Sequence, residues 1–229
     1  MLKILSWNIR QGGGTRIIKI LSKLSSFNAE VVVLSEYKNN DSGARIRAGL
    51  LSAGYRYQYV TAARPADNSA AIFSKLACSA KLYPQADADY PHNVLAAEYE
   101  AFTIFGMYLP HKKHHKLFDF LLDQAKGEKP AIMVGDYNSG INHVDQVGKS
   151  FWYEDKLKAL DKLGYKDAFR VKHGQAKEYS WYSHQGNGYR YDHTYVHESL
   201  VPIIKDCYYL HDWREEKLSD HSPMVLELG

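Results

Sequence analysis

The sequence has few cysteines and no long apolar run. Its two cysteines, Cys78 and Cys207, lie far apart and form no CxxC pair or Cys/His spacing typical of a metal site. We expect two reduced thiols, with one disulfide as the alternative. The N-terminal segment lacks a basic stretch followed by an apolar stretch, which argues against a signal peptide. No segment has the length of a membrane span, so we expect a cytoplasmic protein.

An excess of charge of one sign is also missing. The formal net charge is +3 and the isoelectric point is about 8.6. This balance is compatible with a polyanionic partner without requiring one. No repeat, low-complexity tract or linker interrupts the 229 residues, so we predict a single domain over residues 1–229 and a monomer.

Short apolar runs alternate with longer segments of helical periodicity. We predict helices over residues 16–25, 44–53, 115–125 and 154–163. We predict strands over residues 2–8, 30–35, 55–62, 70–75, 78–83, 94–100, 103–109, 131–135, 189–197, 201–210 and 224–228. The strands between residues 55 and 109 are separated by short turns, which is typical of an antiparallel meander. Helices that bracket two groups of strands indicate an α/β (α+β) fold with two sheets packed face to face.

Polar side chains stand at the ends of several predicted strands, where a packed scaffold would present them to a cleft. These residues are Asn8, Glu36, Tyr108, Asp136, Asn138, Asp192, Asp220 and His221. Each one alone has a simpler explanation, because Asp and Asn at strand ends favour turns and helix caps. Taken together they form a chemically coherent set.

Three of these residues offer hard oxygen ligands. Glu36, Asn8 and Asp220 would suit Mg²⁺ or Mn²⁺ better than Zn²⁺, because these cations prefer carboxylate and carbonyl oxygens. The sequence therefore predicts a divalent cation as cofactor.

Four others supply the remaining chemistry of phosphodiester hydrolysis. Asp136 would orient or deprotonate a water molecule, and Asn138 would hold that water and a phosphate oxygen. His221 would stabilise charge on the phosphate, with Asp192 fixing the tautomer of its ring. Metal, base and cation are the groups that this reaction needs.

Seven short motifs occur in a fixed order along the chain: Trp7-Asn8, Ser35-Glu36, Tyr108 to Pro110, Gly135 to Asn138, Tyr179 to Tyr182, Arg190 to Asp192 and Ser219 to His221. This set resembles the endonuclease/exonuclease/phosphatase superfamily, with matching order and spacing from residue 3 to about residue 227. The resemblance implies a four-layer sandwich of two mixed or antiparallel sheets flanked by helices. It also implies metal ligation by Glu36, with Asn8 and Asp220 close by, and in-line attack at phosphorus.

The motif at Tyr108 is similar to the exonuclease III and abasic-site endonuclease branch, which carries tyrosine before a proline. We therefore include Tyr108 among the catalytic residues, as a phenolate or as a hydrogen-bond donor. His111 departs from that branch, which has Asn or Gln after the proline. The connection at residues 183–189 is shorter than the loop with which abasic-site enzymes grip duplex DNA.

Several residues near these motifs are predicted to contact substrate: Arg10, His111, Lys112, Lys113, Trp181 and Arg190. Basic side chains beside the site would neutralise phosphates, although a basic run can equally be a solvated loop. Tyr37, Tyr137, Tyr189 and Tyr191 can stack on bases, and core packing explains them equally well.

Three functions fit these observations. The first is a metal-dependent nuclease, endo- or exonucleolytic, with DNA favoured over RNA as its substrate. The second is a phosphatase or phosphodiesterase for a small or lipid substrate of the same superfamily. The third is a non-catalytic binding module, which we disfavour because such a protein has no physical reason to keep carboxylates crowded in one pocket.

Overall fold

A computed structural model describes residues 1–229. Its first sheet contains, in spatial order, strands β13 (Ile204–Tyr209), β14 (Met224–Leu228), β1 (Leu2–Asn8), β2 (Val31–Tyr37), β4 (Ser69–Ser74) and β3 (Tyr57–Val60). Its second sheet contains β5 (Ser79–Leu82), β6 (Val94–Glu98), β7 (Thr103–Tyr108), β8 (Ala131–Asp136), β12 (Asp192–His197) and β9 (Tyr165–Asp167). A separate hairpin pairs β10 (Trp181–Tyr182) with β11 (Gly188–Tyr189).

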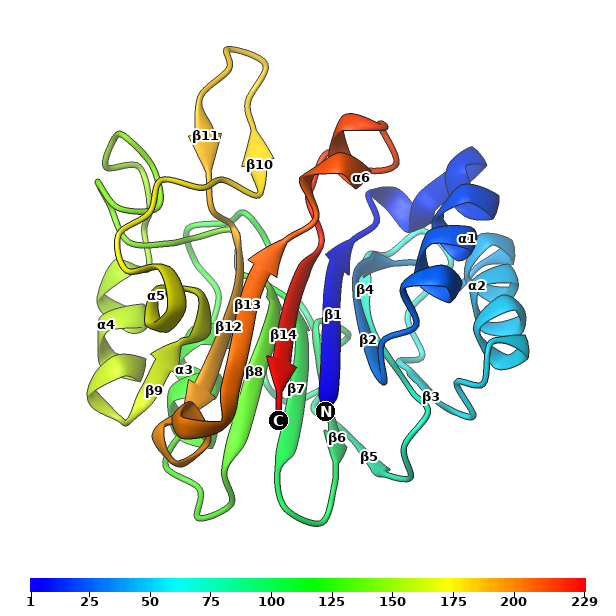
Figure 1. The fold of residues 1–229 in the computed structure, drawn as a ribbon, viewed down its shortest axis with the longest axis horizontal. Helices are drawn as coiled ribbons and strands as arrows, with labels where there is room; N and C mark the ends of the chain where they lie inside the picture. The colour runs from blue at the N-terminus through cyan, green and yellow to red at the C-terminus, as the bar shows by residue number, and fades with distance from the viewer.

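Helices cover the outer faces of the two sheets (Figure 1). Helices α1 (Ile17–Phe27) and α2 (Asp41–Ser52) flank the first sheet, and α3 (Leu117–Gln124) and α4 (Glu154–Lys162) flank the second. Shorter elements are α5 (Ala168–His173), α6 (His211–Glu215) and the 3-10 helices η1 (Gln11–Arg16) and η2 (Glu198–Ile203). The four layers confirm the predicted fold class. None of the helices combines the length and apolarity that crossing a membrane requires.

Strand β2 shows why the sequence folds into layers. Its first four residues are all apolar and all buried. Side chains alternate between the faces of a strand, so Val31 and Val33 enter the core between the sheets. Val32 and Leu34 enter the core beneath α1 and α2. A strand that is buried on both faces needs a continuous apolar run, and each such side chain contributes about 1.5–3 kcal/mol.

Each sheet contains one parallel pair of strands, and this shared feature positions the site. Strands β1 and β2 are parallel, as are β7 and β8. Helix α1 connects the first pair and α3 the second, in the manner of a βαβ crossover. The carboxyl ends of parallel strands lie at one edge of a sheet, so both pairs present their last residues to the junction between the sheets.

Two predictions about strands were wrong. The segment 55–109 is not one meander, because β3 and β4 join the first sheet whereas β5, β6 and β7 join the second. The predicted strand 189–197 is broken: β11 ends at Tyr189 and β12 begins at Asp192. Between them the backbone N–H of Arg190 donates to the carbonyl of Asp145 instead of to a neighbouring strand. Cys78 and Cys207 are free thiols.

Candidate active site

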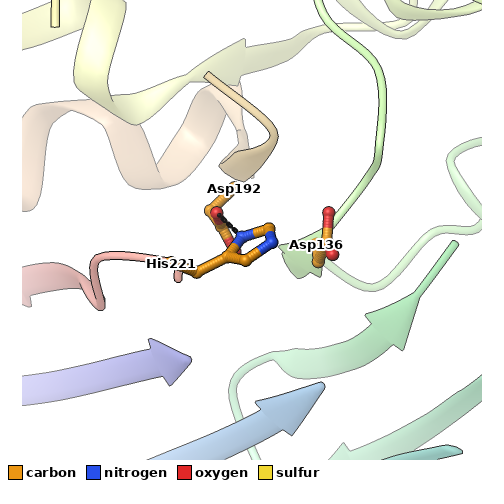
Figure 2. Close-up of side chains that lie close together, drawn as sticks. All are labelled: Asp136, Asp192 and His221. Atoms are coloured by element: carbon orange, nitrogen blue, oxygen red, sulfur yellow. Dashed lines mark hydrogen bonds and ion pairs between the residues drawn. The ribbon is translucent and has the colours of Figure 1, made fainter. Parts of the chain in front are cut away.

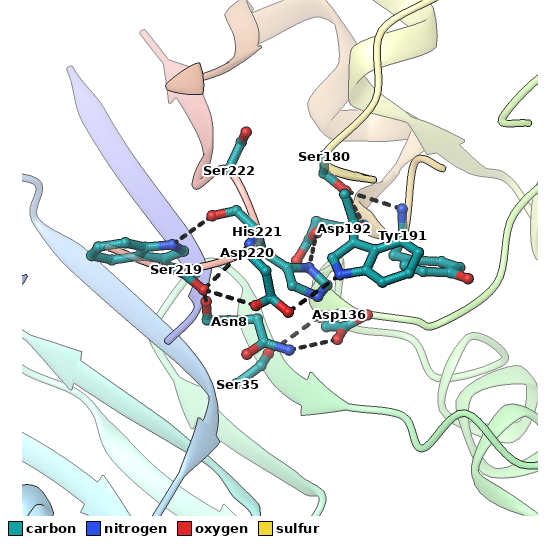
Figure 3. A network of polar contacts seen from close by, with 12 residues as sticks. Asn8, Ser35, Asp136, Ser180, Tyr191, Asp192, Ser219, Asp220, His221 and Ser222 are labelled. Carbon is teal, nitrogen blue, oxygen red and sulfur yellow. Dashed lines mark hydrogen bonds and ion pairs between the residues drawn. The ribbon is translucent and has the colours of Figure 1, made fainter. Parts of the chain in front are cut away.

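One amide joins the two sheets at the edge where their parallel pairs end. The Nδ2 atom of Asn8, at the end of β1, donates to Glu36 Oε1 at 3.2 Å and to Asp136 Oδ2 at 2.8 Å. Glu36 belongs to β2 in the first sheet and Asp136 to β8 in the second. The side chain of Asn8 therefore holds two carboxylates from different sheets beside each other, and Figure 3 shows its contact with Asp136.

A distortion of β2 directs Glu36 into this junction. The register between β2 and β4 shifts between Leu34 and Tyr37, and Glu36 has a left-handed φ of 54°. For a residue with a side chain this conformation costs on the order of 1–3 kcal/mol, and such strain gathers at functional sites. The Oε2 atom of Glu36 accepts a hydrogen bond from the backbone N–H of Gln11 at 2.8 Å, which fixes the half-buried carboxylate.

The turn after β8 brings Asp136 and Asn138 together. Gly135 has a φ of 153°, and a Cβ there would lie 2.0 Å from the carbonyl oxygen of Met107, so only glycine lets β7 and β8 approach. The backbone N–H of Asn138 donates to Asp136 Oδ1 at 2.8 Å, and its Nδ2 donates to Asp136 Oδ2 at 3.1 Å. Asp136 is fully buried and Asn138 half-buried, with a left-handed φ of 46°.

His221 and Asp192 complete a cluster with Asp136. His221 Nδ1 lies 2.8 Å from Asp192 Oδ2, and one ligand atom from each of the three residues lies within 4.8 Å of the others. The imidazole stands between the two carboxylates (Figure 2). Ser180 Oγ accepts from the backbone N–H of Asp192 at 3.2 Å, which anchors the start of β12. The Oδ1 atom of Asp192 is buried without a partner.

Burial and mutual charge shift the ionisation of this cluster. Burial raises the pKa of Asp136 to about 8; the charge of His221 opposes this rise and the charge of Asp192 adds to it. Burial alone would lower the pKa of His221, but Asp192 and Asp136 outweigh it and raise that pKa to about 10. His221 is therefore an imidazolium at neutral pH and Asp136 a carboxyl group that readily holds a proton.

Tyr108 lies beside Asp136, and Asp220 directly precedes His221 in the chain. Tyr108 ends β7 in register with Asp136. Burial, with the charges of Glu36 and Asp136, raises the pKa of Tyr108, so its phenol keeps its proton at neutral pH. The Oδ2 atom of Asp220 accepts from Trp181 Nε1 at 3.3 Å and lies 3.8 Å from Arg10 Nε.

Arg190 is the one predicted substrate contact that the structure contradicts. Its side chain is fully buried, with Nε 2.7 Å from Asp145 Oδ1 and Nη2 2.5 Å from Asp167 Oδ2. A guanidinium that is fully buried between two carboxylates cannot reach a phosphate group in the cleft. The tyrosines Tyr37 and Tyr137 are likewise buried in the core and do not reach substrate.

The other predicted contacts are accessible. Arg10, His111, Lys112 and Lys113 are exposed, and Trp181 is half-buried at the rim. Lys112 and Tyr108 share a groove of about 700 Å³ with Arg64, Asn68 and His92.

Sequence reasoning missed the residues that hold the site in place. Ser35 Oγ accepts from the backbone N–H of Asp136 at 3.3 Å, and Ser219 Oγ donates to the carbonyl of Asn8 at 2.6 Å. Ser180 anchors Asp192. All three serines lie inside the motifs, next to or near a charged residue, and this adjacency was the available signal.

The residues around Glu36 fit a divalent cation. Asn8 donates to the carboxylates of both Glu36 and Asp136, so these two carboxylates lie close together. The amide oxygen of Asn8 is a third oxygen ligand beside them. The cluster of Asp136, Asp192 and His221 also has ligand-like spacing.

The fold and the site together define the class of protein: a hydrolase of phosphate esters with a four-layer α/β sandwich fold. The chain belongs to the endonuclease/exonuclease/phosphatase family, whose model matches residues 5–221. This family depends on divalent metals. The match confirms the predicted resemblance.

Similar proteins include nucleases and a phosphatase. An exodeoxyribonuclease from Streptococcus pneumoniae is 22% identical over 276 aligned positions, which cover 99% of both chains. A 3′ phosphatase from Neisseria, NExo, bound to a product DNA hairpin, superimposes with a TM-score of 0.85 at 20% identity and 100% coverage of both chains. An AP endonuclease from Archaeoglobus fulgidus gives a TM-score of 0.81 at 19% identity, with 100% of this chain and 99% of that chain covered.

Proposed function

We propose that this chain is a divalent-metal-dependent nuclease that hydrolyses the phosphodiester backbone of DNA. The observation that carries the proposal is the position of Asp136. It lies beside the imidazole of His221 and is joined through Asn8 to the carboxylate of Glu36. Proton acceptor, cation and oxygen ligands then converge where one phosphate group fits. The exodeoxyribonuclease relative and the DNA-bound phosphatase support DNA as the polymer.

Asp136 is the group that takes a proton from the attacking water. Its raised pKa of about 8 places it near the working pH, where a general base combines availability with proton affinity. Asn138, bonded to Asp136 through both its backbone N–H and its side chain, orients that carboxyl and reaches the same water.

His221 stabilises negative charge on the phosphoryl oxygens. Asp192 holds Nδ1, which leaves Nε2 to face the substrate as a charged donor. Tyr108 adds a neutral donor from the end of β7. Arg10, Lys112 and Lys113 contact neighbouring phosphates, with His111 and Trp181 beside them.

Glu36, Asn8 and Asp220 would hold Mg²⁺ or Mn²⁺. When bound there, the cation supplies Lewis acidity that helps the leaving oxygen depart. Asp220 meets Arg10 and Trp181 in this structure, so it stands at the outer edge of the group and Glu36 at its centre.

A gel assay tests the proposal. Purified protein is incubated with labelled single-stranded, duplex and abasic-site DNA and with RNA, in Mg²⁺, in Mn²⁺ and in EDTA. We expect metal-dependent cleavage of DNA that EDTA and Asp136→Ala both abolish. Wild-type-like cleavage by the Asp136→Ala protein would remove Asp136 from the proposed mechanism. If wild-type protein cleaves no polymer but releases phosphate from small esters, the second candidate function replaces the first.

A further inference from the structure

A small aromatic pocket opens beside the proposed catalytic cluster. Its volume is about 240 Å³, and its lining includes Asn138, Phe151, Trp152, Tyr191 and His111, with Lys149. Pockets for drug-sized ligands are larger, at roughly 300–1,000 Å³. The aromatic pocket, as we call this set of residues, therefore suits one flat ring system and not a larger ligand.

The rings of the pocket are arranged around an opening instead of being packed flat on one another. His111 meets Trp152 edge to face, with ring centroids 5.1 Å apart and planes at 67°. His111 also meets Tyr191 at 6.0 Å and 80°, and Phe151 meets Tyr191 at 5.9 Å and 65°. Tyr191 is also stacked on Tyr189, at 5.3 Å and 15°, so the ring that remains available to a further aromatic group is that of the exposed Trp152.

Trp152 is the exposed member of the pocket. It is 47% exposed, which is unusual for a residue whose burial would release so much apolar surface. Its neighbour Phe151 is buried, so the loop is anchored while Trp152 stands at the mouth. Exposed aromatic groups that border a hollow commonly mark a binding site.

The pocket is connected to the catalytic cluster through two side chains. Asn138 lines the pocket and donates to Asp136 at 3.1 Å. The ring centroid of Tyr191 lies 6.3 Å from that of His221. A phosphate held at His221 and Asp136 would therefore carry one of its attached nucleosides to the pocket mouth.

We propose that the aromatic pocket binds the nucleobase next to the scissile phosphate after that base has left its pair. This inference rests on the proposed function and names its substrate class: DNA with an unpaired, base-bearing nucleotide, as in a single strand or a frayed end. Every base has a π face that can stack on aromatic side chains, whereas an abasic sugar has none. Lys149 places a cation beside the pocket for the backbone of the same nucleotide.

The test compares Trp152→Ala with Trp152→Phe, which keeps an aromatic face, and with Leu51→Ala, an exposed apolar residue on α2. Cleavage is measured on duplexes that end in a matched pair, a mismatched pair or an abasic nucleotide. Because stacking of one base contributes roughly a 5- to 100-fold effect, Trp152→Ala should lower kcat/KM for the mismatched end by that factor relative to the abasic end. Trp152→Phe should keep most of the preference, and Leu51→Ala all of it.

A binding measurement separates failure of this inference from failure of the proposed function. Fluorescence anisotropy of a labelled thymidine oligonucleotide is recorded in EDTA, where cleavage is off. Weaker binding after Trp152→Ala supports the pocket even if the chain cleaves no DNA. Equal binding by wild type and Trp152→Ala, or an unchanged cleavage preference, overturns it.

Discussion

Two buried charge clusters, the proposed catalytic cluster and a structural cluster, contain the residues on either side of Tyr191 in the chain, Asp192 and Arg190. The catalytic cluster contains Asp136, Asp192 and His221, and the structural cluster contains Asp145, Asp167 and Arg190. Each holds two carboxyl groups around one basic side chain, and all six residues are buried or nearly so. The structural cluster gains two further partners, Arg170 on Asp145 and His193 on Asp167. The difference lies in how completely the charges are paired.

In the structural cluster the guanidinium has enough donors for both acids. Arg190 donates to Asp145 Oδ1 at 2.7 Å and to both oxygens of Asp167 at 3.2 and 2.5 Å. Burial alone would raise the pKa of Asp167, but the charge of Arg190 outweighs it and the pKa falls well below its ordinary range. Both acids stay ionised, and the cluster is inert.

In the catalytic cluster one imidazole faces two acids and cannot satisfy both. Asp192 keeps an oxygen without a partner, and burial raises the pKa of Asp136. On the proposed roles, charge type and burial alone do not distinguish a catalytic cluster from a structural one. An incompletely paired carboxyl group that can still exchange a proton does.

The largest effect should come from removing the proposed base. Asp136→Ala is expected to lower kcat by roughly four orders of magnitude or more, because no other group can take the proton from water. Its unfolding free energy should change little, because removing a carboxyl group whose pKa burial raises offsets the loss of its hydrogen bonds from Asn8 and Asn138. Single-turnover cleavage measures the change in rate, and urea unfolding measures the change in unfolding free energy. Near-wild-type kcat would remove Asp136 from the mechanism.

The charge of the imidazole is tested next. Asp192→Asn keeps the shape of the side chain but removes the charge that holds a proton on His221, so we expect kcat to fall by about two to four orders of magnitude. A matched control is Asp206→Asn, which alters an exposed carboxylate near His173. If both variants cleave alike, His221 does not act as a cation.

A substitution in the structural cluster should lower the free energy of unfolding. Asp167→Ala leaves Arg190 buried with one partner fewer and is expected to lower the unfolding free energy by about 3–5 kcal/mol. Part of this loss comes from the start of α5, where Asp167 accepts from the backbone N–H of Phe169. The control Asp161→Ala breaks an exposed pair with Lys166 and should cost less than about 1 kcal/mol. A folded Asp167→Ala protein should retain its cleavage rate per molecule.

Acid should weaken the structural cluster in a defined direction. The folded pKa of Asp167 lies below the unfolded value of about 4, so its contribution is complete above pH 5 and is lost as pH falls. The unfolding free energy of the wild type should therefore drop more between pH 5 and pH 2.5 than that of Asp167→Asn. Denaturant titrations at several pH values measure this difference. If the unfolding free energies of the two proteins changed equally with pH, the assigned pairing of Asp167 would be wrong.

The sequence could predict what depends on local pattern. Apolar runs identified the inner strands, and polar residues at their ends identified Asn8, Glu36 and Asp136, because the ends of parallel strands meet. Family membership follows from the same motifs. The roles of these residues remain predictions.

Arg190 shows what local pattern cannot resolve. Arg190 was predicted to contact substrate from within a continuous strand over residues 189–197, in which residues 190 and 192 would share a face. The strand starts only at Asp192, and Arg190 turns toward Asp145 and Asp167, which lie 45 and 23 residues away in the chain. Contacts between residues so far apart in the chain cannot be predicted from the local sequence pattern. The same is true of the aromatic pocket to which the loop carrying Trp152 contributes.

The place of β14 in the first sheet has a consequence for biosynthesis. This strand pairs with β1 on one side and β13 on the other, and His221 precedes it by three residues. A growing chain thus carries Glu36 and Asp136 long before the imidazole of His221 emerges from the ribosome. Until then β1 can pair with β2 but not with β14. On the proposed roles, translation order alone leaves the nascent polypeptide without a complete site until β14 has paired with β1.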